Sequence, residues 1–137
     1  MRLATVLFIF LAGCRSIWVR GVIQTADEHP IANALVTARS ADHGTHVVAG
    51  TSEPNGCFDL FHTIGQNENS YFLEVDSPGY KPVRIALAIH VENLLLVTLE
   101  PVASPKASQA RPIRSEERPQ RYGACEPLVS GNTLSLH

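Results

Sequence analysis

"TSEPNGCFDLF", residues 51–61, contains the turn and the strand pattern that decide the fold class. Asn55-Gly56 is the dipeptide that best tolerates positive φ, and it stands between two strand-like runs. Beyond this turn Phe58 and Leu60 alternate with less apolar neighbours, which is the period of a strand with one buried face. The stretch therefore predicts a β-hairpin with its core on one side.

Similar short runs, separated by turn residues, recur from residue 17 to residue 99 about ten residues apart, a spacing typical of β-sandwiches. In residues 85–96 apolar side chains are so dense that a short helix is an alternative to strand there. The pattern predicts an all-β protein, a single seven-stranded antiparallel Greek-key β-sandwich. The predicted strands are residues 17–24, 34–40, 45–52, 57–62, 71–76, 82–87 and 94–100.

The N-terminal residues have the order of a secretory leader: one positive charge, an apolar run and then small residues. The run is shorter than the roughly 20 residues that a membrane-spanning helix needs, because Arg15 interrupts it. Leu11-Ala12-Gly13-Cys14 resembles a bacterial lipobox, so residues 1–13 are predicted to be a lipoprotein signal peptide.

In lipoproteins of that kind the cysteine carries the lipid, which implies that Cys14 is the attachment point and residues 14–16 are a short anchor linker. Asp after this cysteine is the usual signal for retention in the inner membrane, and Arg15 is not Asp. The resemblance thus implies a lipid-anchored protein on the outer membrane, facing the periplasm. A plain secretory leader, or a start codon placed too early, with Cys14 incidental, is the alternative.

Residues 102–137 differ in composition from the rest of the chain. Pro105, Pro112 and Pro119 are interspersed with charged residues, and few large apolar side chains are present. Such a segment buries too little apolar surface to offset the entropy of ordering it. It is predicted to be a mostly disordered, flexible tail, with residues 128–136 as the part that could dock.

Six turn and strand motifs stand in an order that resembles the carboxypeptidase regulatory-like domain, a transthyretin-like (prealbumin-like) sandwich. The resemblance implies that residues 17–101 form this domain, which serves other proteins as a non-catalytic binding or spacing module. The family often has Gly where Asn33 stands, and Asn is the next best residue in a left-handed position. The matching stretches are VRGVI at 19–23, HPIANALV at 29–36, TSEPNGCF at 51–58, YFLEV at 71–75, SPGYKP at 77–82 and VTL at 97–99.

The chain has three cysteines. If Cys14 is acylated, Cys57 and Cys125 remain as a pair, and an oxidising compartment would let them form a disulfide between the tail and the sandwich. The alternation predicts that Cys57 points away from Phe58, outward or under the tail. Two free thiols, or a buried Cys57 that acts as a small apolar side chain, are the alternatives.

No sequence motif indicates catalysis. Asp42, His43 and His46 could suggest a metal site, but no further ligand lies beside them, and a solvated loop is the better prediction. No nucleophile elbow and no phosphate-binding loop is present. The net charge of −2 and the absence of a basic run argue against nucleic acid as a partner. We therefore expect neither an enzyme nor a cofactor.

These observations predict a membrane-anchored, periplasm-facing lipoprotein with a non-catalytic protein-interaction or envelope-scaffold function. Its partners would be the membrane, through Cys14, and an envelope protein or peptide that adds to an edge strand of the sandwich. A carbohydrate-binding accessory module is the alternative, with Trp18, Phe61 and Tyr71 as candidate platform residues. Exposed aromatic side chains on one sheet face would favour that alternative.

Overall fold

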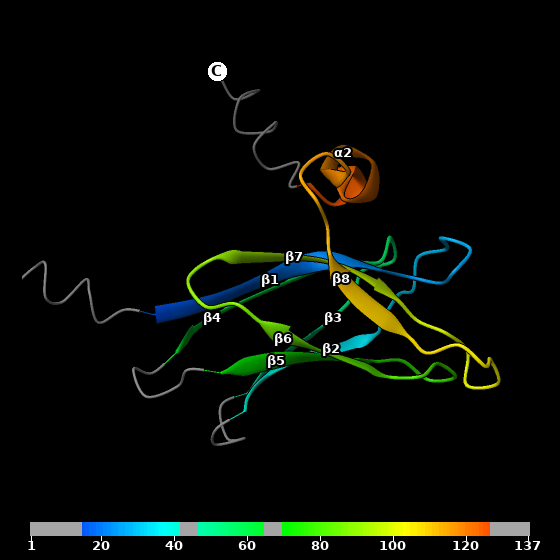
Figure 1. Cartoon of the computed structure of the whole chain (residues 1–137), viewed down its shortest axis with the longest axis horizontal. Coiled ribbons are helices and arrows are strands. Elements are labelled where there is room, and N and C mark those ends of the chain that lie inside the picture. The colour runs from blue at the N-terminus through cyan, green and yellow to red at the C-terminus, as the bar shows by residue number, and fades with distance from the viewer. Residues whose placement is uncertain (1–14, 42–46, 65–69, 127–137) are drawn as a thin grey trace, which may run out of the picture.

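The computed structural model describes residues 15–41, 47–64 and 70–126, which form two four-stranded sheets packed face to face (Figure 1). Sheet A has the strand order β4-β1-β7-β8 and sheet B the order β3-β2-β5-β6. The strands are β1 (Arg15–Gln24), β2 (Leu35–Ser40), β3 (Val47–Thr51), β4 (Cys57–Ile64), β5 (Tyr71–Asp76), β6 (Val83–Leu87), β7 (Glu92–Thr98) and β8 (Gln109–Pro112). Two short helical turns follow, α2 (Arg118–Arg121) and η1 (Gly123–Cys125).

The all-β sandwich is confirmed, but its predicted strand number and pairing are wrong. An eighth strand, β8, pairs with β7 and comes from the segment predicted to be a tail. Sheet A is mixed, since β1 runs parallel to β7, with Ile23 opposite Val97, and all the other pairs are antiparallel. Parallel pairing needs a long crossover, and the chain makes one by building sheet B between β1 and β7. The short helix considered for residues 85–96 is not formed there.

The turn at Asn55-Gly56 forms as predicted, but the hairpin does not. Gly56 has a φ of 84°, and its N–H donates to the Glu53 carbonyl oxygen at 2.8 Å. However, β3 pairs with β2 in sheet B, whereas β4 pairs with β1 in sheet A. The turn is therefore an arch between the sheets, because the long β1 offers β4 a better partner than its neighbour in sequence does.

The core lies between the sheets and takes the inward-facing side chains of both, in line with the alternation in the sequence. Val19, Leu73 and Val97 are completely buried in it. Gly21 is needed where sheet A is tightest, since a Cβ there would collide with the Leu95 carbonyl oxygen and come within 2.9 Å of the Phe58 ring.

Two further turn predictions are confirmed. Gly79 has a φ of 85°, and the Tyr80 N–H donates to the Ser77 carbonyl oxygen at 3.0 Å, as a type II turn requires. Asn33 adopts the left-handed conformation, with a φ of 60°. These turns depend on one or two residues each, which explains why local sequence was enough to predict them.

At the N-terminus β1 already begins at Arg15, so the predicted linker at residues 14–16 is wrong for its last two residues. Cys14 and the predicted signal peptide, residues 1–13, lie outside the described residues. Within residues 15–41, 47–64 and 70–126, no helix has the length and apolar character needed to cross a membrane.

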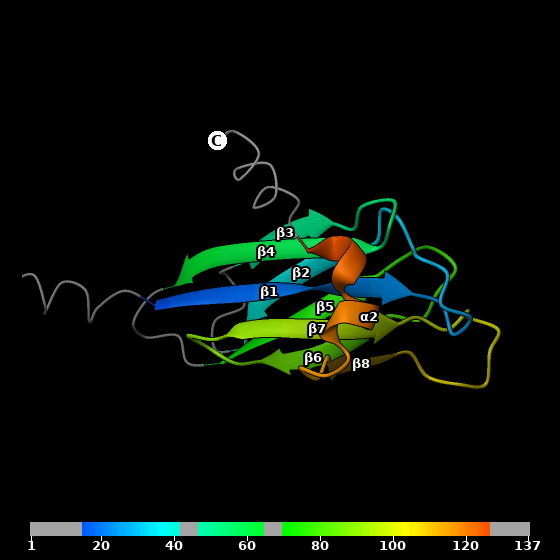
Figure 2. The same ribbon diagram turned by 90° about the horizontal axis from the view of Figure 1, so that it is seen from above.

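The prediction of a disordered tail is wrong for residues 102–126. After β8 the chain crosses the outer face of sheet A, and Figure 2 shows α2 lying over β1 and β7. We call residues 113–126 the C-terminal strap. Its buried Ile113 and Tyr122 are too far apart in sequence to form a recognisable pattern, which is why composition alone suggested disorder. The docking predicted for residues 128–136 lies outside the described residues.

Candidate functional site

The outer face of sheet A has a covered half and an open half. Trp18, Arg20 and Val22 alternate along β1 and point to this face, away from the core. Over the second half of β1 the strap closes a small apolar cluster, separate from the core. The cluster consists of Val22, Leu96, Ile113 and Tyr122, with Leu94 and Cys125 packed against it.

A disulfide between Cys57 and Cys125 ties the strap to the sheet, as predicted. The two residues are 68 positions apart in sequence, and their Cα atoms are 5.6 Å apart. Cys57 opens β4 on the side opposite Phe58, so its sulfur reaches the outer face under the strap, where Cys125 lies. The cross-link therefore fixes the C-terminal end of the strap over sheet A.

Arg20 is a buried cation at the boundary between the two halves. Only 6% of it is exposed, and its Nη1 donates to Glu92 Oε2 at 3.0 Å while its Nε lies 3.5 Å from Asp59 Oδ2. Its guanidinium carbon lies 5.1 Å from the ring centroid of Trp18 and 5.4 Å from that of Tyr122. Nothing in the sequence around Arg20 signals this burial, because the covering Tyr122 is about a hundred residues away.

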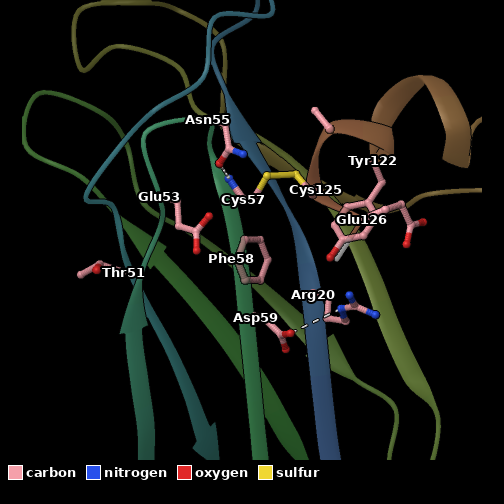
Figure 3. A pocket seen from close by; sticks show the side chains of 11 residues that line it. Arg20, Thr51, Glu53, Asn55, Cys57, Phe58, Asp59, Tyr122, Cys125 and Glu126 are labelled. Carbon is pink, nitrogen blue, oxygen red and sulfur yellow. Dashed lines mark hydrogen bonds and ion pairs between the residues drawn. A yellow bond between two sulfur atoms is a disulfide. The ribbon is translucent and has the colours of Figure 1, made fainter. Parts of the chain in front are cut away.

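A cavity of about 390 Å³ lies where the strap meets the start of β4 (Figure 3). Arg20 and the disulfide line it, and the close-up shows the Glu53 and Asp59 carboxylates on one side and Tyr122 and Glu126 on the other. Glu126 is bound by Arg118, whose Nε lies 2.7 Å from Glu126 Oε1. The cavity thus combines several polar groups with both sulfur atoms.

Three ionisable groups of this cavity, Arg20, Tyr122 and Glu126, have shifted pKa values. The hydrogen bond from Arg118 lowers the pKa of Glu126, so it stays a carboxylate. Burial raises the pKa of the Tyr122 hydroxyl, which stays neutral. Burial by itself would lower the pKa of Arg20, but the hydrogen bond to Glu92 and the neighbouring charges outweigh it, and the pKa is raised. None of these three shifts moves a group toward titration near pH 7, so the arrangement suits binding rather than proton transfer.

The open half of the face carries a pair of exposed aromatic rings. Trp18 is 38% and Phe61 61% exposed; they stand opposite each other on β1 and β4, with ring centroids 6.5 Å apart and planes crossing at 81°. Trp18 Nε1 donates to Asp59 Oδ1 at 3.1 Å, which fixes the indole. Of the three aromatic residues singled out in the sequence, the face thus brings two together, whereas Tyr71 is buried in the core.

Phe61 also lies on the edge of sheet A, because β4 is the outermost strand and pairs only with β1 among the described elements. The Gly56 carbonyl oxygen accepts the Ile23 N–H of β1, so even-numbered residues of β4 bond to β1. The backbone groups of Asp59, Phe61 and Thr63 therefore point to the free edge. Eight residues make β4 the longest edge strand of the described fold.

No group of three or more His, Cys, Asp or Glu side chains within the described ranges could hold a metal ion. Asp42, His43 and His46, the residues considered for a metal, lie outside those ranges.

Neither a model of a protein family nor a curated protein matches the sequence. Among solved structures, the fold is distantly similar to 3-chlorocatechol 1,2-dioxygenase from Rhodococcus opacus 1CP, with 12% sequence identity and a TM-score of 0.41. The similarity covers 70% of this chain and 57% of that enzyme's chain. It is a likeness between β-sandwiches and identifies no family.

Proposed function

We propose that this protein is a bacterial envelope lipoprotein whose sandwich, of the carboxypeptidase regulatory-like type, is a non-catalytic protein-interaction or scaffold module. Cys14 carries the lipid after removal of residues 1–13, and the anchor holds the domain on the outer membrane, facing the periplasm. Support comes from the leader pattern and from the order of the turn motifs. Since β1 begins at Arg15, the domain starts directly at the anchored residue.

The observation that carries the interaction function is the exposed Trp18–Phe61 pair beside the free edge of β4. The backbone groups of Asp59, Phe61 and Thr63 can pair with an extended segment of a partner, which would extend sheet A by one strand. Removing a large, mostly exposed side chain such as Phe61 from water on binding is favourable. The partner is accordingly an extended, apolar segment of an envelope protein.

The exposed Trp18 also favours the alternative, a carbohydrate-binding accessory module. Sugar platforms, however, stack successive rings on aromatic faces that share a plane, and the planes of Trp18 and Phe61 cross at 81°. Retardation in polysaccharide gels that is lost on Trp18→Ala would favour the carbohydrate function over the peptide function.

Site-specific photo-crosslinking in intact cells tests the interaction. A photoreactive residue is placed at Phe61 or, as the control, at Val102, which is 64% exposed at the far end of the sandwich. We expect a discrete adduct from position 61 and none from position 102. Equal patterns from the two positions would contradict a binding site at β4.

A proline tests the edge pairing itself. Thr63→Pro removes an N–H that points to the free edge and leaves the ladder with β1 intact. One lost hydrogen bond should lower the crosslinking yield at position 61 about three- to tenfold, whereas the control Thr63→Ala should keep it. A Thr63→Pro protein that crosslinks like the wild type would exclude edge pairing.

The anchor is tested by the intact mass of the membrane-extracted protein. We expect the loss of residues 1–13 and an added lipid mass, and we expect Cys14→Ala to leave the membrane fraction. An unmodified mature chain would rule out the anchor without touching the interaction site.

A further inference from the structure

The C-terminal strap is a peptide segment already seated on the outer face of sheet A. Its Tyr122 is 2% exposed and packs with Ile113 against Val22 and Leu96 of the sheet. The Arg20 guanidinium below the Tyr122 ring adds a cation–π contact. The sheet thus has a place for one aromatic side chain, and the strap fills it.

Charge complementarity surrounds this aromatic contact. Arg118 Nη1 lies 3.3 Å from Glu92 Oε1 of β7, and Arg121 forms an ion pair with Glu28. In these two pairs the carboxylates belong to the sandwich and the guanidiniums to the strap, while Arg118 also binds Glu126 within the strap at 2.7 Å. The surface beneath the strap recognises an aromatic residue flanked by arginines, because such a segment presents both complementary groups at once.

The strap itself is weakly held apart from the disulfide. Helix α2 has only four residues and buries none of them, and Glu117 gives it no side-chain cap. A second cavity, of about 360 Å³, lies between residues 112–118 and β7, so the strap does not fit tightly there. Ordering its 14 positions costs conformational entropy, and only two large side chains are buried in return. The disulfide is therefore the main constraint that keeps the strap docked.

Cys57 and Cys125 are both among the residues that line the cavity of about 390 Å³, and Cys125 is the more exposed residue of the two. This cavity is the route by which a dithiol reductant would approach the disulfide. One reductant thiolate attacks Sγ of Cys125, Cys57 leaves as a thiolate that takes a proton, and the second reductant thiol then displaces Cys125. Two electrons pass to the protein, which becomes a dithiol, and the reductant becomes a disulfide.

Building on the proposed function of this outer face, we infer that the strap is a redox-latched internal competitor. Reduction of Cys57–Cys125 releases it and opens a second docking surface, formed by Val22, Leu96 and Arg20 next to Trp18. The occupant of the opened surface is a segment of another envelope protein that carries an aromatic residue flanked by arginines. The released surface continues the open half, so the two halves then form one face.

Release of the strap is measured on the full chain with Cys57→Ser and Cys125→Ser. We expect trypsin to cleave after Arg114 and Arg121 at least about tenfold faster than in the oxidised protein, as for a segment that becomes free. The core strands should stay folded and remain far better protected from hydrogen exchange than the strap. Unchanged cleavage in the double variant would show a strap that docks without the latch, and would overturn the switch.

Recognition is measured with a synthetic peptide of residues 113–126 that carries Cys125→Ser. The acceptor is the double variant with Tyr122→Ala added, so that its own strap does not compete at high effective concentration. Because the tethered strap undocks without the disulfide, the free peptide should bind this acceptor only weakly, with a Kd of about a millimolar, and should not bind the oxidised protein. Tyr122→Ala in the peptide should weaken this binding about tenfold or more in an NMR titration. Equal binding by both peptides would overturn the aromatic contact.

Two further results separate the possible occupants. Reduced wild-type protein that elutes as a dimer would show that a second copy's strap fills the surface, and would overturn the assignment to another protein. Crosslinking at position 61 of the oxidised protein tests the proposed function alone. If it fails, the results on release of the strap are unaffected, and if the strap is not released, the crosslinking result is unaffected.

Discussion

The core between the sheets and the cluster beneath the strap are both apolar, yet they are held in different ways. In the core, Leu73 on β5 and Val97 on β7 are completely buried, and each of these strands is hydrogen-bonded to a neighbour on both sides. In the cluster, Tyr122 and Ile113 come from a segment that makes few backbone bonds to the sheet and depends on a cross-link. One fold thus contains a region that is stable by packing and another that is stable by tethering.

The largest expected effect concerns the core. Leu73→Ala leaves a cavity among completely buried neighbours and should lower the free energy of unfolding by about 2–5 kcal/mol. Urea denaturation measures it, and the slope m should stay at the wild-type value, because the surface exposed on unfolding is unchanged. A loss below about 1 kcal/mol, the range of ordinary surface substitutions, would mean that the core repacks.

The next effect concerns the tether. Cys57→Ser with Cys125→Ser removes a closure of 68 residues, worth at most about 4 kcal/mol in the chain-entropy treatment. Amides of the strap should then exchange hydrogen fast while those of β5 stay slow, since the released strap opens without unfolding the core. If strap and core amides exchanged with one common free energy of opening, the strap would be part of the same cooperative unit as the core.

A smaller effect is expected at Ser52, whose buried hydroxyl forms hydrogen bonds with two backbone groups. The Ser52 hydroxyl donates to the Ile31 carbonyl oxygen at 2.7 Å and accepts the Ala34 N–H at 2.9 Å. Ser52→Ala leaves both buried backbone groups without a partner and should cost about 1–3 kcal/mol in urea denaturation. Ser52→Thr, which keeps the hydroxyl, serves as the control and should retain more of the stability.

The smallest effect is a pH dependence confined to the strap. Hydrogen bonds from Arg111 and from the Arg114 N–H lower the pKa of Glu117 to about 2 from an ordinary value of 4.5. A carboxylate with a depressed pKa contributes its full stability above about pH 4.5, and the contribution disappears as the pH falls toward 2. Amide resonances around Glu117 should shift as the pH falls toward 2, while those of β3, which contains no carboxylate, should not.

Glu117→Gln should remove that shift, whereas Glu116→Gln, at an exposed neighbour, should keep it. A strap that shows the same pH response in both variants would place the titration elsewhere.

Much of the sandwich was predictable because its signals are local. The alternation around Phe58 and Leu60 identified a core face, and the turns at Gly56 and Gly79 needed no distant partner. The pairing of Cys57 with Cys125 was predicted only on the condition that Cys14 is acylated, with two free thiols as the alternative, and the structure shows the disulfide. The sequence could not show which aromatic candidates are exposed. Tyr71 and Phe61 occupy similar alternating positions, and only the packing of the sheets buries Tyr71 and leaves Phe61 exposed.

The sequence by itself determined the local conformations: the turns, the strand period, and a tail of low apolar content. The tertiary structure alone decided that β4 joins β1, that β7 runs parallel to β1, and that the strap buries Arg20 beneath Tyr122. The reason is physical: turn and strand preferences act within a few residues, whereas pairing and burial depend on contacts between residues far apart in the chain. The covered and open halves of sheet A arise from such contacts.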